Sequence, residues 1–233
     1  MASRILTSPD HAQMKTYSCP QYSKTWWSVR RGVPTASEFS RIFTASGDLS
    51  RQSVAYIEEL VAARVNPDTD YYAGGYVSDA MQRGKALEPE ARAEYDLRND
   101  PVTQVGFCVT DDGRFGCSPD GLVGGNGLLE LKCPLPATHE RYLRKGVLPT
   151  KYRPQVHGQL LVTGRKWCDF VSYCPGSKTL CVRVYPDAYT LALRGALETM
   201  YRTYAKSLMA EVEKLNAPIP LDWEELENRY GSN

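Results

Sequence analysis

Cys117-Ser118-Pro119-Asp120-Gly121 and, after a glycine-rich turn, Gly127-Leu128-Leu129-Glu130-Leu131-Lys132 are the two stretches that decide the fold. The second stretch predicts a strand, and side chains alternate between the two faces of a strand. Glu130 and Lys132 therefore share one face, while the leucine between them points to the other, apolar side. Asp120 ends the preceding strand, and the turn can bring its carboxylate beside that of Glu130. We therefore expect two carboxylates to converge beside one lysine.

This arrangement favours metal-assisted phosphodiester hydrolysis. Two like charges in one cleft repel each other unless a divalent cation takes up the charge. Oxygen ligands suit Mg²⁺ or Mn²⁺ better than zinc, and the carbonyl of Leu131 can add a further oxygen. The metal would polarise a phosphate and acidify a water, while Lys132 would orient that water or offset charge in the transition state. The structural alternative is an ordinary ion pair between Glu130 and Lys132, with Asp120 capping a turn.

The composition fits one α/β domain. The chain has 233 residues, 42% apolar and 24% charged, enough to bury one core. Helical patterns surround a run of short strands, so we expect a single domain over residues 1–233, with a central mixed sheet flanked by helices and with residues 1–24 and 217–233 peripheral or flexible. No segment approaches the ~20 apolar residues of a membrane helix. The seven cysteines contain no C-x-x-C pair, which predicts reduced thiols in a cytoplasmic protein without a membrane partner.

Local patterns predict the elements around the two deciding strands. A capping-box pattern at 35–38 predicts a helix that runs to about Thr44. Residues 78–97 are rich in helix formers, and we expect Pro89 to kink this helix or to mark its first turn. Residues 102–110 and 114–118 predict a hairpin. The remaining predictions are strands at 127–133, 167–174 and 179–185, and helices at 137–145, 152–163 and 188–215.

Basic residues are placed unevenly along the chain. The net charge of +1 indicates nothing about a nucleic-acid partner. Between Glu140 and Lys166, however, seven bases stand against one acid, and these bases are Arg141, Arg144, Lys145, Lys151, Arg153, Arg165 and Lys166. We therefore expect a local basic face that can receive a polyanion.

The order of the motifs resembles the bacteriophage lambda exonuclease-like alkaline exonucleases, a viral recombinase family of the PD-(D/E)XK nuclease superfamily. Ser118-Pro119-Asp120-Gly121 with Glu130-Leu131-Lys132-Cys133-Pro134 is similar to the nuclease signature. The segments 30–38, 84–88 and 155–157 resemble, in this order, three further blocks of the family. The resemblance covers about Trp26 to Thr163 and implies a restriction-endonuclease-like fold.

The resemblance also implies a role for each matched residue. Asp120, Glu130 and the carbonyl of Leu131 would hold two Mg²⁺ or Mn²⁺ ions, assisted by Glu88, and Lys132 would support the attacking water. The residues implied to bind DNA are Arg30, Ser37 and Ser118 in a pocket for the 5′-terminal phosphate, Gln155 and His157 near a phosphate, and Met81 where the family carries an apolar wedge. A helix start after Thr35 could itself hold a phosphate. For His157 the alternative is a solvated or packed histidine, and for Met81 it is filling of the core.

The activity that the resemblance implies is a Mg²⁺-dependent 5′-to-3′ exodeoxyribonuclease acting on linear duplex DNA. It would release mononucleotides and leave a 3′ single-stranded overhang for recombination by strand annealing. The implied assembly is a homotrimer around the duplex, with a single-strand annealing protein as partner, encoded by a phage or prophage and acting in the bacterial cytoplasm. The alternatives are an endonuclease of the same superfamily, restriction-like or junction-resolving, and a catalytically silent module that binds DNA ends.

Overall fold

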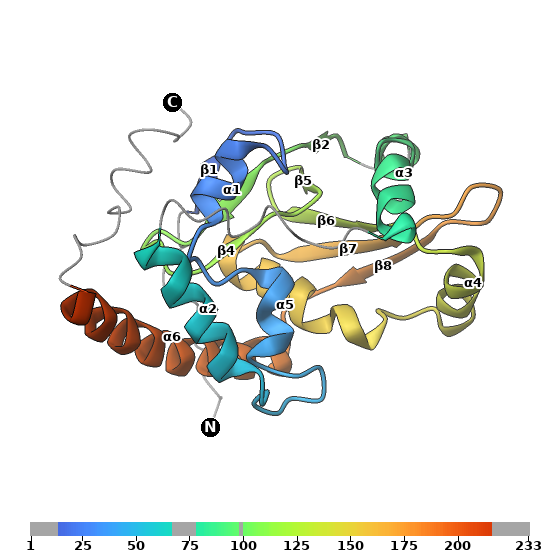
Figure 1. Ribbon diagram of the computed structural model, residues 1–233. Helices are drawn as coiled ribbons and strands as arrows, with labels where there is room; N and C mark the ends of the chain where they lie inside the picture. Colours follow the sequence, from blue (N-terminus) through green and yellow to red (C-terminus); the bar gives the residue numbers. More distant parts are fainter. Residues whose placement is uncertain (1–13, 67–77, 98–99, 216–233) are drawn as a thin grey trace, which may run out of the picture.

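The computed structural model describes residues 14–66, 78–97 and 100–215 and contains a five-stranded and a three-stranded sheet (Figure 1). The larger sheet has the order β2-β5-β6-β7-β8. Only β6 and β7 run parallel in it, and the other neighbours are antiparallel. Its strands are β2 (Val102–Thr103), β5 (Gly121–Val123), β6 (Gly127–Lys132), β7 (Trp167–Ser172) and β8 (Leu180–Val184). The smaller, antiparallel sheet has the order β1-β3-β4, with β1 (Lys15–Tyr17), β3 (Phe107–Val109) and β4 (Gly116–Cys117).

Helices cover both faces of the larger sheet. They are α1 (Lys24–Arg30), α2 (Ser53–Val65), α3 (Asp79–Asp96), α4 (Pro136–Lys145), α5 (Arg153–Thr163) and α6 (Ala188–Leu215), together with the 3₁₀ helices η1 (Ala36–Arg41) and η2 (Thr150–Tyr152). Leu128 of β6 packs under α5, whereas Leu129 and Leu131 pack under α3. Because side chains alternate along β6, Glu130 and Lys132 are on the α5 side. The predicted α/β class and the helix-flanked sheet are confirmed.

The predicted strand at 102–110 is wrong, because this segment contributes to both sheets. β2 pairs with β5, whereas β3 pairs with β1 and β4. Gly106 lies between the two strands, where a Cβ atom would stand 2.2 Å from the carbonyl oxygen of Cys19. The chain thus changes sheets at a position that only glycine fits. The predicted hairpin is confirmed in part, because β3 and β4 form an antiparallel pair.

The predicted helix from Thr35 to Thr44 is also wrong. Residues 36–41 form the 3₁₀ helix η1, and the side chain of Thr35 makes no capping hydrogen bond. Its hydroxyl instead contacts Ser37 and Arg30. Pro89 lies inside α3 and does not mark its first turn. The predicted helix at 188–215 is confirmed, because α6 has the same bounds.

The N-terminal segment contributes to the fold from its first described residues. Tyr17 on β1 is 1% exposed and packs with Phe107 of β3. Of the described residues 14–24, Tyr17 therefore belongs to the core, whereas Ser18, Pro20, Tyr22 and Lys24 are exposed. Residues 217–233 lie outside the described residues. Within the described ranges, no helix combines the length and the apolar character needed to cross a membrane.

Candidate active site

Glu130 and Lys132 form the centre of the site on β6. The Nζ atom of Lys132 lies 2.5 Å from Oε1 of Glu130, and the side chains are 27% and 2% exposed. Gln155 and Gln159, one turn apart on α5, donate from Nε2 to Oε1 and Oε2 of Glu130, each over 2.6 Å. Glu130 thus receives hydrogen bonds at both oxygens. The predicted shared face of Glu130 and Lys132 is confirmed, whereas the burial of Glu130 goes beyond what the spacing indicated.

The prediction that Asp120 ends the preceding strand is wrong, because β4 ends at Cys117 and Asp120 lies directly before β5. Its side chain reaches across to β6, with which β5 pairs. Its Oδ2 atom accepts a hydrogen bond of 2.6 Å from the backbone N–H of Leu131. Burial, followed by the negative charge of Glu130, raises the pKa of Asp120 to about 8. Burial by itself lowers the pKa of Lys132, but Glu130 and Asp120 outweigh this effect and raise it. These mutual influences place both carboxylates and the lysine in one electrostatic cluster, as the sequence predicted.

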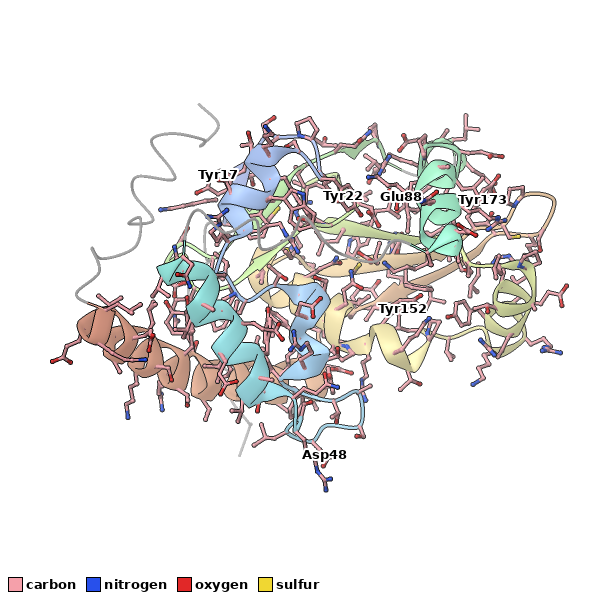
Figure 2. All side chains as sticks on the ribbon, in the orientation of Figure 1. Tyr17, Tyr22, Asp48, Glu88, Tyr152 and Tyr173 are labelled. Atoms are coloured by element: carbon pink, nitrogen blue, oxygen red, sulfur yellow. The ribbon has the colours of Figure 1, made fainter. Side chains whose placement is uncertain are left out.

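Glu88 joins this cluster from α3. Burial raises its pKa, while the charges of Lys132 and Arg92 act in the opposite direction. Glu88 and Asp120 line a cleft of about 530 Å³ together with Tyr22 and Lys85. Figure 2 shows Glu88 on α3, beside the segment that carries Tyr22. The structure therefore brings the predicted third carboxylate to the same cleft as Asp120.

A second cluster collects Arg30, Ser118, Thr35 and Ser37. Arg30 donates from Nη1 to Oγ of Ser118 over 3.0 Å, and its Nη2 lies 3.4 Å from Oγ1 of Thr35. The hydroxyl of Thr35 is 3.2 Å from that of exposed Ser37. The guanidinium of Arg30 also stacks 4.1 Å from the ring centroid of Trp26. A fixed cation beside three hydroxyls is a site suited to a phosphate. We call it the Arg30 pocket.

Ser118 links the Arg30 pocket to the carboxylates. It stands two residues before Asp120, and its Oγ atom also accepts a hydrogen bond of 2.9 Å from the indole of Trp26. A step of two residues spans at most ~7 Å of chain. The anion pocket and the carboxylate cluster are therefore neighbours, set by one short segment between β4 and β5.

His157 lies outside both clusters. Its ring is 3% exposed, and Nδ1 is 2.8 Å from the hydroxyl of Thr190 on α6. Burial lowers its pKa, which favours the neutral ring. Because α5 turns about 200° over two residues, Gln155 lies on the opposite side of the helix from His157. Gln155 contacts Glu130 from that side. The structure thus brings Gln155 and not His157 to the site. Met81 belongs to α3, but its side chain lies outside the described part of the chain.

Two bases of the segment between Glu140 and Lys166 make hydrogen bonds within the fold. Arg153 donates to the carbonyl of Ala45, and Arg165 donates to the carbonyls of Gly124 and Gly127. The bases that remain exposed are Arg141, Arg144, Lys145, Lys151 and Lys166. The basic face expected from the sequence is therefore smaller than the residue count indicated.

Sequence reasoning missed the roles of Gln159, Thr35 and Tyr22. The spacing of Gln155 and Gln159 was a signal, because residues four apart lie on the same face of a helix. The pattern at 35–38 predicts that Thr35 caps a helix, and this prediction gives no indication of its contact with Arg30. Tyr22 has a φ of 68°, the only positive value outside glycine among the described residues, and no pattern in the sequence indicates it. Such backbone conformations are frequent at ligand sites.

The residues present fit a divalent cation held partly by substrate. Within the described residues, no group of three His, Cys, Asp or Glu side chains is close enough to hold a metal ion. Mg²⁺ is commonly bound by one or two carboxylates together with water and substrate phosphates. Asp120 and Glu130 are such a pair; burial is the main cause of the raised pKa of Asp120, and the charge of Glu130, which a cation would offset, adds to it.

Comparisons with known proteins identify the family of the chain. Two solved structures of the alkaline exonuclease LHK-Exo from Laribacter hongkongensis, one of them in complex with dAMP, are similar to the chain, with sequence identities of 34% and 35%. Each comparison has a TM-score of 0.68 and covers 83% of this chain and 96% of the LHK-Exo chain. A phage-related exonuclease from Haemophilus somnus 129PT has the same fold, with 12% identity, a TM-score of 0.55 and coverage of 77% and 96%. No protein of curated function matches the chain. Residues 25–166 match the family described as the YqaJ-like viral recombinase domain. The chain therefore belongs to the YqaJ-like viral recombinase family.

Proposed function

We propose that the chain is a Mg²⁺-dependent exodeoxyribonuclease that digests one strand of linear duplex DNA from its 5′ end and leaves a 3′ single-stranded overhang. One observation carries the proposal: the Arg30 pocket and the carboxylate cluster are joined by the two-residue step from Ser118 to Asp120. A terminal phosphate in the pocket would place the next phosphate of the same strand at the carboxylates. The resemblance to LHK-Exo, named an alkaline exonuclease, supports this reading.

Hydrolysis would break the bond between phosphorus and O3′ of the terminal nucleotide. The water oxygen forms the new bond to phosphorus, one proton of that water leaves, and the departing O3′ is protonated. Lys132, which lies beside Glu130, would orient the attacking water or offset the charge that develops on the phosphoryl oxygens. The products are a 5′-mononucleotide and a strand that again ends in a 5′-phosphate, which fits the Arg30 pocket for the next cycle. The dAMP complex of LHK-Exo agrees with a mononucleotide product.

Metal binding would involve Asp120, Glu130 and the carbonyl of Leu131, with Glu88 assisting from α3. When bound, two Mg²⁺ ions, or Mn²⁺ in their place, would supply Lewis acidity at the phosphate and a water of lowered pKa. Glu130 is held by two amides and a lysine, so the plane of its carboxylate is fixed. Gln155 would act through Glu130 and lie near the scissile phosphate. Met81 is proposed as an apolar wedge between the two DNA strands.

The proposed setting is recombination in the cytoplasm of a bacterial host, with the gene carried by a phage or prophage. The description of the family as a viral recombinase domain supports a role in recombination. We propose a homotrimer that encloses the duplex and a single-strand annealing protein that receives the overhang. Both proposals rest on the resemblance to the lambda-type exonucleases.

The experiment compares 5′-phosphorylated linear duplex with closed circular DNA, in Mg²⁺ and in EDTA, and follows the release of nucleotides. We expect nucleotides from the linear duplex in Mg²⁺ alone. Asp120→Ala should abolish release and leave binding to the DNA end largely intact, because the Arg30 pocket does not contain Asp120. Cutting of the circle would favour an endonuclease. Digestion unchanged by Asp120→Ala would refute the assigned site, and salt-sensitive binding without any digestion would favour a silent end-binding module.

A further inference from the structure

Gln159 is a buried amide that holds one oxygen of the central carboxylate. The residue is 1% exposed, and its Nε2 atom donates to Oε2 of Glu130 over 2.6 Å. The opposite end of the amide, Oε1, lies 3.8 Å from the thiol of Cys168 on β7, which donates to it. The amide is therefore held at both ends, and its orientation toward Glu130 is fixed by the strand behind it.

Glu130 combines deep burial with three hydrogen-bond donors. Oε1 receives Nε2 of Gln155 and the ammonium of Lys132, while Oε2 receives Gln159. A buried carboxylate oxygen without a donor costs free energy, so an apolar side chain at position 159 would leave Oε2 unsatisfied. This requirement explains a polar residue at position 159, but it does not by itself explain why the residue is neutral.

The neutrality of the amides distinguishes a cation site from a structural ion pair. Gln155 and Gln159 fix the plane of the carboxylate without cancelling its charge, whereas an arginine or lysine would cancel it. Lys132 supplies one positive charge beside Glu130 and Asp120, and the neighbouring cleft is lined by Glu88, Lys85 and Arg92. The two amides therefore fix the carboxylate of Glu130 in a rigid frame without adding positive charge, which suits a small hard cation.

Position 159 lies on a part of α5 that is tightly packed. At Gly158 a Cβ atom would stand 2.4 Å from the ring of Phe39, so η1 and α5 approach as closely as side chains allow. Val156 and Leu160 pack against Leu128 and Phe170 of the sheet. The helix therefore has little freedom to carry Gln159 away from Glu130.

We propose that Gln159 is a positioning residue that orients Glu130 for a divalent cation. The inference rests on the proposed function, because it assumes that Glu130 takes part in metal binding. Gln159 acts through Glu130 and touches neither the substrate nor the cation. Partners that orient metal ligands typically change metal affinity or activity by about 10- to 100-fold when they are removed, and we expect an effect of this size.

The test uses Gln159→Met, which keeps the length of the side chain and removes the donor. Mn²⁺ binding is measured by electron paramagnetic resonance without DNA, and the Mg²⁺ concentration for half-maximal nucleotide release is measured separately. We expect both to shift by about 10-fold or more toward weaker binding. Binding to a 5′-phosphorylated duplex end in EDTA should not change, because the Arg30 pocket is intact. Leu160→Val is the matched control, since it perturbs the neighbouring core position without touching Glu130 and should leave Mn²⁺ affinity unchanged.

The urea midpoint of each variant shows whether the protein remains folded. If Gln159→Met does not fold, Gln155→Met removes the companion donor at a half-buried position and must weaken Mn²⁺ binding instead. A folded Gln159→Met with wild-type Mn²⁺ affinity would overturn the inference alone. A wild-type protein that neither binds Mn²⁺ nor releases nucleotides would overturn the proposed function as well, so the two failures are distinguishable.

Discussion

Asp120→Asn should make the metal-free protein more stable at alkaline pH while it removes activity. The ordinary pKa of an aspartate is 3.8, and burial with the charge of Glu130 raises that of Asp120 to about 8. Below about pH 4 the carboxyl is protonated in both the folded and the unfolded chain. As the pH rises to about 8 the unfolded chain loses this proton first, so the free energy of unfolding falls. Asparagine avoids this loss and can still accept the N–H of Leu131 through its side-chain oxygen.

The size of the effect follows from the shift. About four pKa units correspond to an upper limit of about 6 kcal/mol. Asp120 lines an open cleft, where solvent screens its charge, so we expect a gain of about 1 to 3 kcal/mol in the free energy of unfolding. The measurement is urea unfolding in EDTA at about pH 5 and about pH 9, for the wild type and for the variant. The advantage of Asp120→Asn should grow with pH.

Asp112→Asn is the control of opposite sign. Although burial raises the pKa of Asp112, hydrogen bonds from Thr110 and Arg114 lower it overall. Its ionised form therefore stabilises the fold above the ordinary pKa, and this contribution is lost as the pH falls. Asp112→Asn should be less stable than the wild type by the same amount at about pH 5 and about pH 9, because both values lie above the ordinary pKa of 3.8. An Asp120→Asn variant that loses stability at both pH values, or gains equally at both, would refute the electrostatic account of the cluster.

Three further predictions address the anion pocket and α5. Arg30→Gln should lower kcat/KM on 5′-phosphorylated ends by about 10-fold or more, since a charge-assisted hydrogen bond contributes about 1.5 to 3 kcal/mol; an equal loss on 5′-hydroxyl ends would contradict a phosphate pocket. Gly158→Ala should cost about 1 to 3 kcal/mol in urea unfolding, because its Cβ atom would meet the ring of Phe39 at 2.4 Å; unchanged stability would show that η1 can shift. His157→Gln should leave the kinetics of nucleotide release within about 2-fold of the wild type, because the ring faces Thr190, and a large loss of kcat would instead place His157 in the site.

The parts of the site that could be predicted are those that follow from the alternation of side chains between the two faces of a strand. The alternation of side chains placed Glu130 and Lys132 on one face and Leu131 on the other, and the structure confirms both statements. The predicted turn directly after Asp120 is wrong, because β5 follows Asp120 and the chain turns only after this strand. The predicted approach of the Asp120 carboxylate to β6 is confirmed by the hydrogen bond that it accepts from Leu131. These are local relations, so they can be read from neighbouring residues.

The remaining parts depend on contacts between distant segments. Thr35 matched a capping pattern, but Arg30 and Ser37 compete for its hydroxyl and only the packed structure decides which contact forms. The segment 102–110 had strand character throughout, but the close approach of Cys19 at Gly106 divides it between two sheets.

The sequence alone determined the strand that carries Glu130 and Lys132, the class of fold and the resemblance to a nuclease family, because periodicity and motif order are properties of the chain itself. Tertiary structure alone decided that Gln159 reaches Glu130, that His157 turns away toward α6, and that Arg30 meets Ser118 across 88 residues. The physical reason is that burial and hydrogen bonding between α5, β6 and the N-terminal segment depend on how these elements pack, and no local pattern encodes that packing.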